Sequence, residues 1–112
     1  MSALDRLELN IKEHKQNIQK GEALKRLMLT RDFLEIVMKG YLEQEAIRLV
    51  HLKSDIDFQS PNTQASIIRA IDSIGGFKQY LDNISQQHEQ AIKDLEMDSQ
   101  TITELINLEI AQ

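Results

Sequence analysis

The stretch FKQYLDNISQQHEQAIKDL, residues 77–95, repeats an apolar or semi-apolar position at intervals of four and three residues. These intervals place the repeated side chains along one side of an α-helix, in the a and d positions of a heptad pattern. The repeated positions are Phe77, Leu81, Ile84, His88, Ala91 and Leu95. The pattern predicts a helix from Phe77 to Met97 or beyond. The segment after Asp98 either continues it or restarts at a capping box of Thr101 and Glu104.

A second stripe of the same kind lies near the other end of the chain, in MSALDRLELNIKEHKQNIQK, residues 1–20. Its positions are Leu4, Leu7, Ile11, His14 and Ile18, with intervals of three, four, three and four. Ser2 is suited to the N-cap, and Asp5 lies in the first turn, where a carboxylate favours the helix dipole. Gly21 is placed to end the helix, which we therefore expect over residues 3–20.

Between the stripes, the residues up to Lys53 are rich in apolar side chains and predict three short helices, over 22–29, 31–39 and 41–53. Thr30 is suited to cap a helix start, and Gly40 to end a helix. Alternatively, Gly40 remains inside a helix that joins the last two, at a cost of about 1 kcal/mol relative to Ala.

A break over residues 54–60 is followed by Ser60-Pro61, an N-cap before a proline at the first helical position. A further helix is expected from Pro61 to Ile74, because the adjacent pair Gly75-Gly76 is a strong stop signal.

These elements predict an all-α fold, a helical bundle of about five to six helices in one domain, residues 1–112. Long amphipathic helices at the N-terminal end (1–21) and at the C-terminal end (77–112) would flank a core of short helices (22–76). A chain of this length is within the usual range for one domain.

Composition restricts the classes of function. The chain has no cysteine, which excludes disulfide scaffolds, thiolate metal sites and cysteine nucleophiles. No signal peptide is visible, and no run of apolar residues is long enough to cross a membrane. We therefore expect a soluble, intracellular protein.

Charge is distributed unevenly. Residues 1–53 carry 10 basic and 8 acidic side chains (+2), whereas residues 54–112 carry 3 basic and 10 acidic (−7). The acidic half would repel phosphate backbones, which confines any nucleic-acid binding to the first half. The candidate residues there are Lys20, Lys25, Arg26, Arg31 and Lys39. Acidic residues interleave with them, so a solvated surface of mixed charge is favoured over a nucleic-acid site.

No motif predicts catalysis, a cofactor or a metal. The three histidines, His14, His51 and His88, are each 37 residues apart and lack the i, i+4 spacing of two metal ligands on one helical face. No serine lies in a nucleophile elbow. The chain is therefore predicted to be no enzyme.

His14 and His88 each interrupt an otherwise apolar stripe. The simpler interpretation is that each ring lies at the edge of a packed surface and reaches water. The alternative is that both histidines lie in an interface that weakens as they become protonated near pH 6, because a buried imidazolium without a carboxylate is unfavourable.

The two stripes are the strongest functional signal. Either they pack onto the central block within one chain, or they pair with another copy or another protein, as coiled-coil arms do. The predicted interface residues are Leu4, Leu7, Ile11, His14 and Ile18 in one stripe and Leu81, Ile84, His88, Ala91 and Leu95 in the other.

The segment from Phe33 to Leu81 resembles small helical proteins of tailed bacteriophages, which are often encoded among virion structural genes. The resemblance rests on FLEIVMKGYLEQEAIRLVHLKSD and AIDSIGGFKQYL, with the pairs Gly40-Tyr41 and Ile74-Gly75. It implies a virion-associated or morphogenesis factor, located in the host cytoplasm or associated with the virion, and it defines no site residues.

Two functional hypotheses follow. The first is a protein that assembles with copies of itself or with a larger phage structural protein through its helical stripes. The second is a phage-encoded acidic inhibitor or adaptor that binds a host protein through its C-terminal half. A nucleic-acid or nucleotide binder is a third, weaker alternative.

Overall fold

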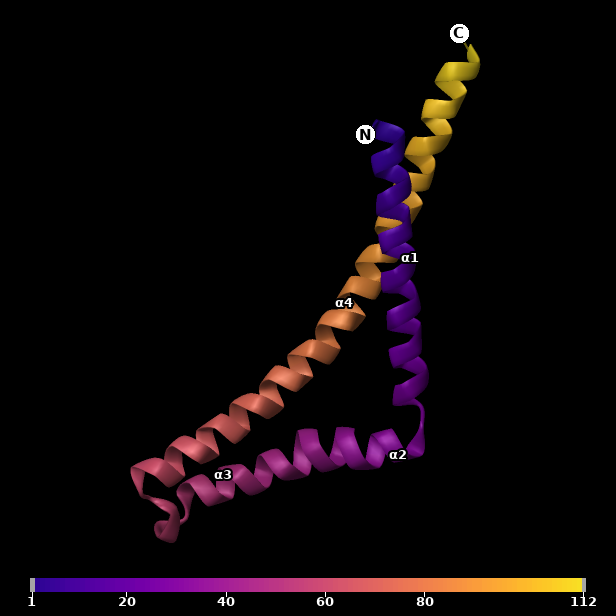
Figure 1. Ribbon diagram of the computed structural model, residues 1–112. Coiled ribbons are helices and arrows are strands. Elements are labelled where there is room, and N and C mark those ends of the chain that lie inside the picture. The colour runs from indigo at the N-terminus through magenta and orange to yellow at the C-terminus, as the bar shows by residue number, and fades with distance from the viewer. Residues whose placement is uncertain (1, 112) are drawn as a thin grey trace. The chain divides into compact units, whose positions relative to one another are not determined.

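The computed structural model describes residues 2–111, and nearly all of them are helical, with no strand among them (Figure 1). The helices are α1 (Ala3–Met28), α2 (Arg31–Phe33), the π-helix η1 (Leu34–Glu45), α3 (Ala46–Ser54), the 3₁₀ turn η2 (Ile56–Phe58) and α4 (Pro61–Ala111). The all-α prediction is confirmed.

The helices are fewer and longer than predicted. The backbone stays in the right-handed helical region where α2, η1 and α3 meet, so residues 31–54 form one continuous element, which we call the middle helix. The described residues therefore contain three long helical elements, and the prediction of five to six helices is not confirmed. Gly40 lies inside the middle helix, as the alternative interpretation had it.

The predicted ends at Gly21 and at Gly75-Gly76 are wrong. α1 continues through Gly21 to Met28, and α4 continues through both later glycines and past Asp98 without a break. A glycine inside a helix costs about 1 kcal/mol, which is small beside the burial of apolar side chains on both sides of it. Ile74 and Leu81, which flank the glycine pair, are 6% and 8% exposed.

Two helix starts have the predicted caps, whereas Thr30, before the middle helix, forms no side-chain cap and donates its hydroxyl to the Leu27 carbonyl instead. Ser2 and Asp5 bond reciprocally: the Ser2 hydroxyl accepts from the Asp5 N–H, and the Asp5 carboxylate accepts from the Ser2 N–H, both at 3.1 Å. At the start of α4 the Ser60 hydroxyl accepts from the Thr63 N–H at 3.3 Å, and Pro61 is the first helical residue.

Contacts divide the chain into two units. The terminal unit consists of Met1–Leu24 and Asn83–Gln112, and the middle unit is Lys25–Asp82. In the middle unit, Leu49, Ile67 and Ile74 are the buried centre of an apolar cluster. Five half-buried side chains pack around them: Leu42, Ala46, Leu52, Ala70 and Ile71. The Tyr41 and Phe77 rings also meet edge to face in this unit, with centroids 5.9 Å apart. The prediction of one domain over residues 1–112 stays a prediction.

Candidate functional site

The terminal unit is an antiparallel pair formed by α1 and the C-terminal part of α4 (Figure 1). Ser2, Ala3 and Leu4 line a groove together with Leu105, Ile106 and Glu109, from opposite ends of the chain. Further along the pair, His14 lies against Asp98 and Gly21 against His88. We call the surface buried between these two helices the seam.

The seam contains most of the predicted interface residues. Ile84, His88 and Ala91 are buried. Half-buried positions on the same sides of the helices are Leu7, Ile11, His14, Ile18 and Leu95. Leu4 is exposed, and Leu81 is buried but belongs to the middle unit. The two stripes therefore meet within one chain, whereas their predicted binding to another chain stays a prediction.

The two helices approach each other closely at Gly21 and His88. A Cβ atom added at Gly21 would lie 2.3 Å from the His88 Cβ, 2.4 Å from its Cγ and 2.5 Å from its Cδ2. No real side chain fits at such distances, so the His88 side chain occupies the space that the missing side chain leaves. Gly21 is therefore a packing residue of the seam.

His88 is 4% exposed, and its Nδ1 is buried without a hydrogen-bond partner. Buried polar atoms in native proteins nearly always have a partner, and the lack of one costs stability. A polar residue in a helical seam is often retained because it fixes the register of the helices. Because the surrounding seam residues are apolar, we infer that His88 fixes the register of the two helices.

His14 differs from His88 because it has an acidic partner. Its Nε2 lies 3.1 Å from the Asp98 Oδ2, with the two side chains 19% and 22% exposed. A protonated His14 would thus face a carboxylate. The predicted weakening on protonation assumed histidines without a carboxylate, and this condition does not hold at His14.

Sequence reasoning missed Gly21, Leu24 and Asp98 as seam residues. The signal was the stripe interval itself: Ile18 to Gly21 is three residues, and Leu95 to Asp98 is three. Gly21 was instead interpreted as a helix end, and Asp98 as the point after which the helix either continues or restarts.

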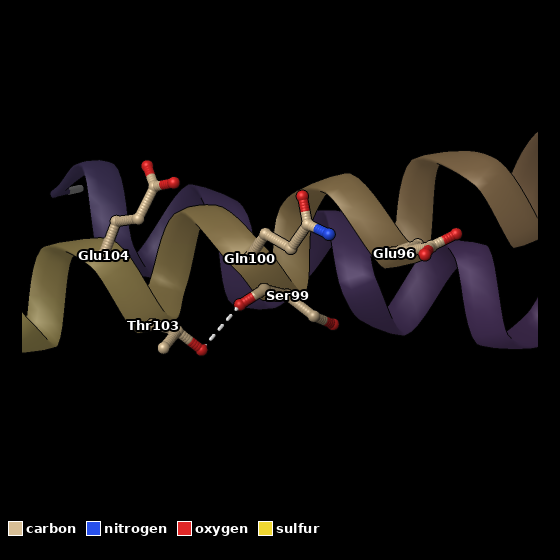
Figure 2. A pocket seen from close by; sticks show the side chains of 5 residues that line it. All are labelled: Glu96, Ser99, Gln100, Thr103 and Glu104. Atoms are coloured by element: carbon tan, nitrogen blue, oxygen red, sulfur yellow. Dashed lines mark hydrogen bonds between the residues drawn. The ribbon is translucent and has the colours of Figure 1, made fainter.

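Some hollows of the described surface are formed by a single helix. Figure 2 shows one, formed by Glu96, Ser99, Gln100, Thr103 and Glu104 along α4 alone. The Thr103 hydroxyl donates to the Ser99 carbonyl at 3.0 Å, a bond internal to the helix. One exposed helical face supplies no second wall around a substrate, unlike the concave sites that bind small molecules.

A second hollow lies on the middle helix, beside Gly40. It is lined by Ile36, Val37, Gly40, Tyr41 and Glu45. A Cβ at Gly40 would lie 3.0 Å from the Glu35 carbonyl oxygen, so the π-helical turn itself favours glycine here. π-Helical turns are rare and occur frequently at functional sites.

Among residues 2–111 no three His, Cys, Asp or Glu side chains lie close enough together to hold a metal ion. No helix in this part of the chain is long and apolar enough to span a membrane. No protein-family model, curated protein or solved structure matches the chain.

Proposed function

We propose that the chain is a non-enzymatic assembly protein that binds other protein chains, its own copies first, through helical faces that its fold leaves without a partner. The observation that carries this proposal is the amount of apolar surface left exposed in the middle unit. Soluble monomers rarely expose contiguous apolar patches beyond a few hundred Å², and larger ones mark interaction sites.

The middle unit has few buried side chains for its length. Its buried apolar residues are Leu49, Ile67, Ile74 and Leu81. A greater number of large apolar side chains remain exposed in the same unit: Leu27, Leu29, Leu34, Ile36, Ile47, Val50, Ile56, Phe58 and Ile68. A unit whose core lies between two helices buries one stripe of each, and its remaining apolar residues need another surface. A bundle of more than two helices would then form between copies.

The balance of charge favours the middle unit as the site of association. It carries eight basic and eight acidic side chains, whereas the terminal unit carries five basic and ten acidic. A net charge near zero promotes association, and a net charge of −5 opposes the approach of like units. The resemblance to phage proteins suggests a virion-associated or morphogenesis role for such an assembly.

A second candidate is supported by the acidic surface of α4. Residues 83–112 contain six acidic side chains and one basic one, Lys93. Glu96 and Glu104 both lie on the exposed face that Figure 2 shows. An adaptor or inhibitor that binds a basic surface of a host protein would use this face, and its binding would weaken as salt screens the charges.

Light scattering of the purified chain at low and high salt separates the two functions. Assembly through apolar faces predicts a mass that is a multiple of 12.9 kDa and changes little with salt. A mass of 12.9 kDa at every concentration and salt would contradict assembly with its own copies and favour the acidic adaptor.

A further inference from the structure

One side of the middle helix carries exposed side chains next to the side that packs on α4. Leu42, Ala46 and Leu49 belong to the apolar cluster of the middle unit. The residues that follow them by one position lie about 100° further round a helix and face away from that cluster. These residues are Glu43, Ile47 and Val50, and all three are exposed.

The exposed side formed by Glu43, Ile47 and Val50 extends toward the start of the middle helix. In a π-helix, residues four or five apart lie near one another, because the turn is wider than in an α-helix. Leu34, Lys39, Glu43 and Ile47 are separated by five, four and four residues. We call Leu34, Lys39, Glu43, Ile47 and Val50 the outer strip. Leu34 is 39% exposed, and Ile47 and Val50 are 57% and 56% exposed.

The two charges at the centre of the outer strip do not neutralise each other within the chain. Other pairs at helical spacing do: Arg31 bonds Glu35, and Lys78 bonds Asp82. Lys39 and Glu43 are also four residues apart and both exposed, yet neither forms an ion pair with a residue in the range 2–111.

We propose that a second copy of this chain packs antiparallel on the outer strip, with Lys39 of each copy opposite Glu43 of the other. This inference rests on the proposed assembly function and names its partner and its face. In a two-fold arrangement every contact occurs twice, so both Lys39–Glu43 pairs form together. The same register places Leu34 between the second copy's Ile47 and Val50, and apolar side chains thus meet apolar side chains.

A second copy suits this strip better than an unrelated partner. A strip with one central cation and one central anion is complementary to itself when turned end to end. The middle unit is neutral as a whole, so its copies approach without net repulsion.

Charge reversal with mixing tests the proposal. In Lys39→Glu alone, each copy would place a glutamate opposite the second copy's Glu43, and in Glu43→Lys alone two lysines would meet. We expect each variant to dissociate about tenfold or more readily than the unaltered chain, because like charges meet twice. An equimolar mixture of the two variants contains only opposite pairs in the mixed dimer and should regain the mass of the unaltered assembly.

The mixture distinguishes contact between copies from pairing within one helix. A double variant, Lys39→Glu with Glu43→Lys, would be restored under both models, whereas mixing two single variants restores only pairs between chains. If the mixture remains dissociated like its components, the antiparallel register is wrong.

An apolar substitution with a matched control completes the experiment. Ile47→Glu should abolish association, whereas Leu108→Glu, at a 62% exposed position of α4 in the terminal unit, outside the strip, should leave the mass unchanged. Far-UV circular dichroism of each variant verifies that the helices still form.

Failure of this inference is distinct from failure of the assembly function. An unaltered chain that associates, with a mass insensitive to Ile47→Glu and to both charge reversals, would overturn the outer strip and leave assembly standing. An unaltered chain that stays at 12.9 kDa overturns both.

Discussion

Replacing Gly21 by alanine tests the central feature of the terminal unit. On helix propensity alone, Gly→Ala inside a helix stabilises by about 1 kcal/mol. At Gly21 the new Cβ would lie 2.3 Å from the His88 Cβ, whereas carbon atoms in contact are about 3.5–4.0 Å apart. The two helices would have to separate by more than about 1 Å at this point.

That separation would loosen the packing of the buried side chains nearby, Leu24, Ile84 and Ala91. Overpacking of a fitted site typically costs about 1–3 kcal/mol, and here the neighbour is a Cβ atom fixed to the backbone. We therefore take the upper end of this range and subtract the propensity gain of about 1 kcal/mol. Gly21→Ala is then expected to lower the free energy of unfolding by about 2 kcal/mol. Urea unfolding followed by circular dichroism measures the change. Hydrogen exchange of the α1 amides locates it in the seam.

Two variants at His88 make the test specific. His88→Ala should not rescue Gly21→Ala, because the nearest atom in the contact is the Cβ that alanine keeps. His88→Gly removes all three close atoms and should recover part of the lost stability, despite its own cost as a glycine in a helix. A Gly21→Ala chain more stable than the unaltered one would refute the close approach.

Substitutions at the other three glycines and at Asp5 test the same physical argument. Gly75→Ala and Gly76→Ala should each raise the free energy of unfolding by about 1 kcal/mol in urea titrations, because a Cβ at either position meets nothing within 4 Å. Gly40→Ala should lack this gain, since its Cβ would lie 3.0 Å from a backbone carbonyl oxygen; equal stabilisation at the three positions would argue against the π-helical turn. The pKa of Asp5 is lowered below its usual 3.8, chiefly by the hydrogen bond from the Ser2 backbone N–H. This carboxylate therefore stabilises the start of α1 above that pH and ceases to do so as the pH falls through its lowered pKa. Asp5→Asn should remove that part of the acid dependence in exchange measurements on the first turn.

The sequence predicted the all-α class and both stripes because these depend on local periodicity. Its predictions of helix ends at glycine residues were wrong. Gly21, Gly40 and Gly75 all had the character of helix ends, since glycine is both a poor helix former and the preferred residue after a helix. What keeps a helix intact through glycine is contact with residues distant in sequence, such as His88 opposite Gly21. A single sequence does not display such contacts.

The pairing of the two stripes likewise could not be predicted from the local periodicity of the sequence. Each stripe is amphipathic by itself, and periodicity does not say which apolar surface covers it. Two contacts define the antiparallel pairing: Gly21 lies against His88, and His14 lies against Asp98. A gap on one helix and a polar ring on the other are complementary features, but they are 67 residues apart in the chain.

The polar residues of the seam explain why α1 and α4 pair in one register. If α1 slipped by one heptad, His88 would face His14 or Met28, where a side chain fills the space that Gly21 leaves open. The same slip would place His14 opposite Ala91 or Leu105 instead of Asp98. The hydrogen bond between His14 and Asp98 would then be lost. A fully apolar seam would tolerate either slip, because leucine packs on leucine at every heptad. The unsatisfied Nδ1 of His88 lowers stability in the observed register. The His88 side chain, which fits beside Gly21, and the His14–Asp98 contact disfavour the slipped registers. A terminal unit fixed in this way packs its stripe residues against each other within the chain.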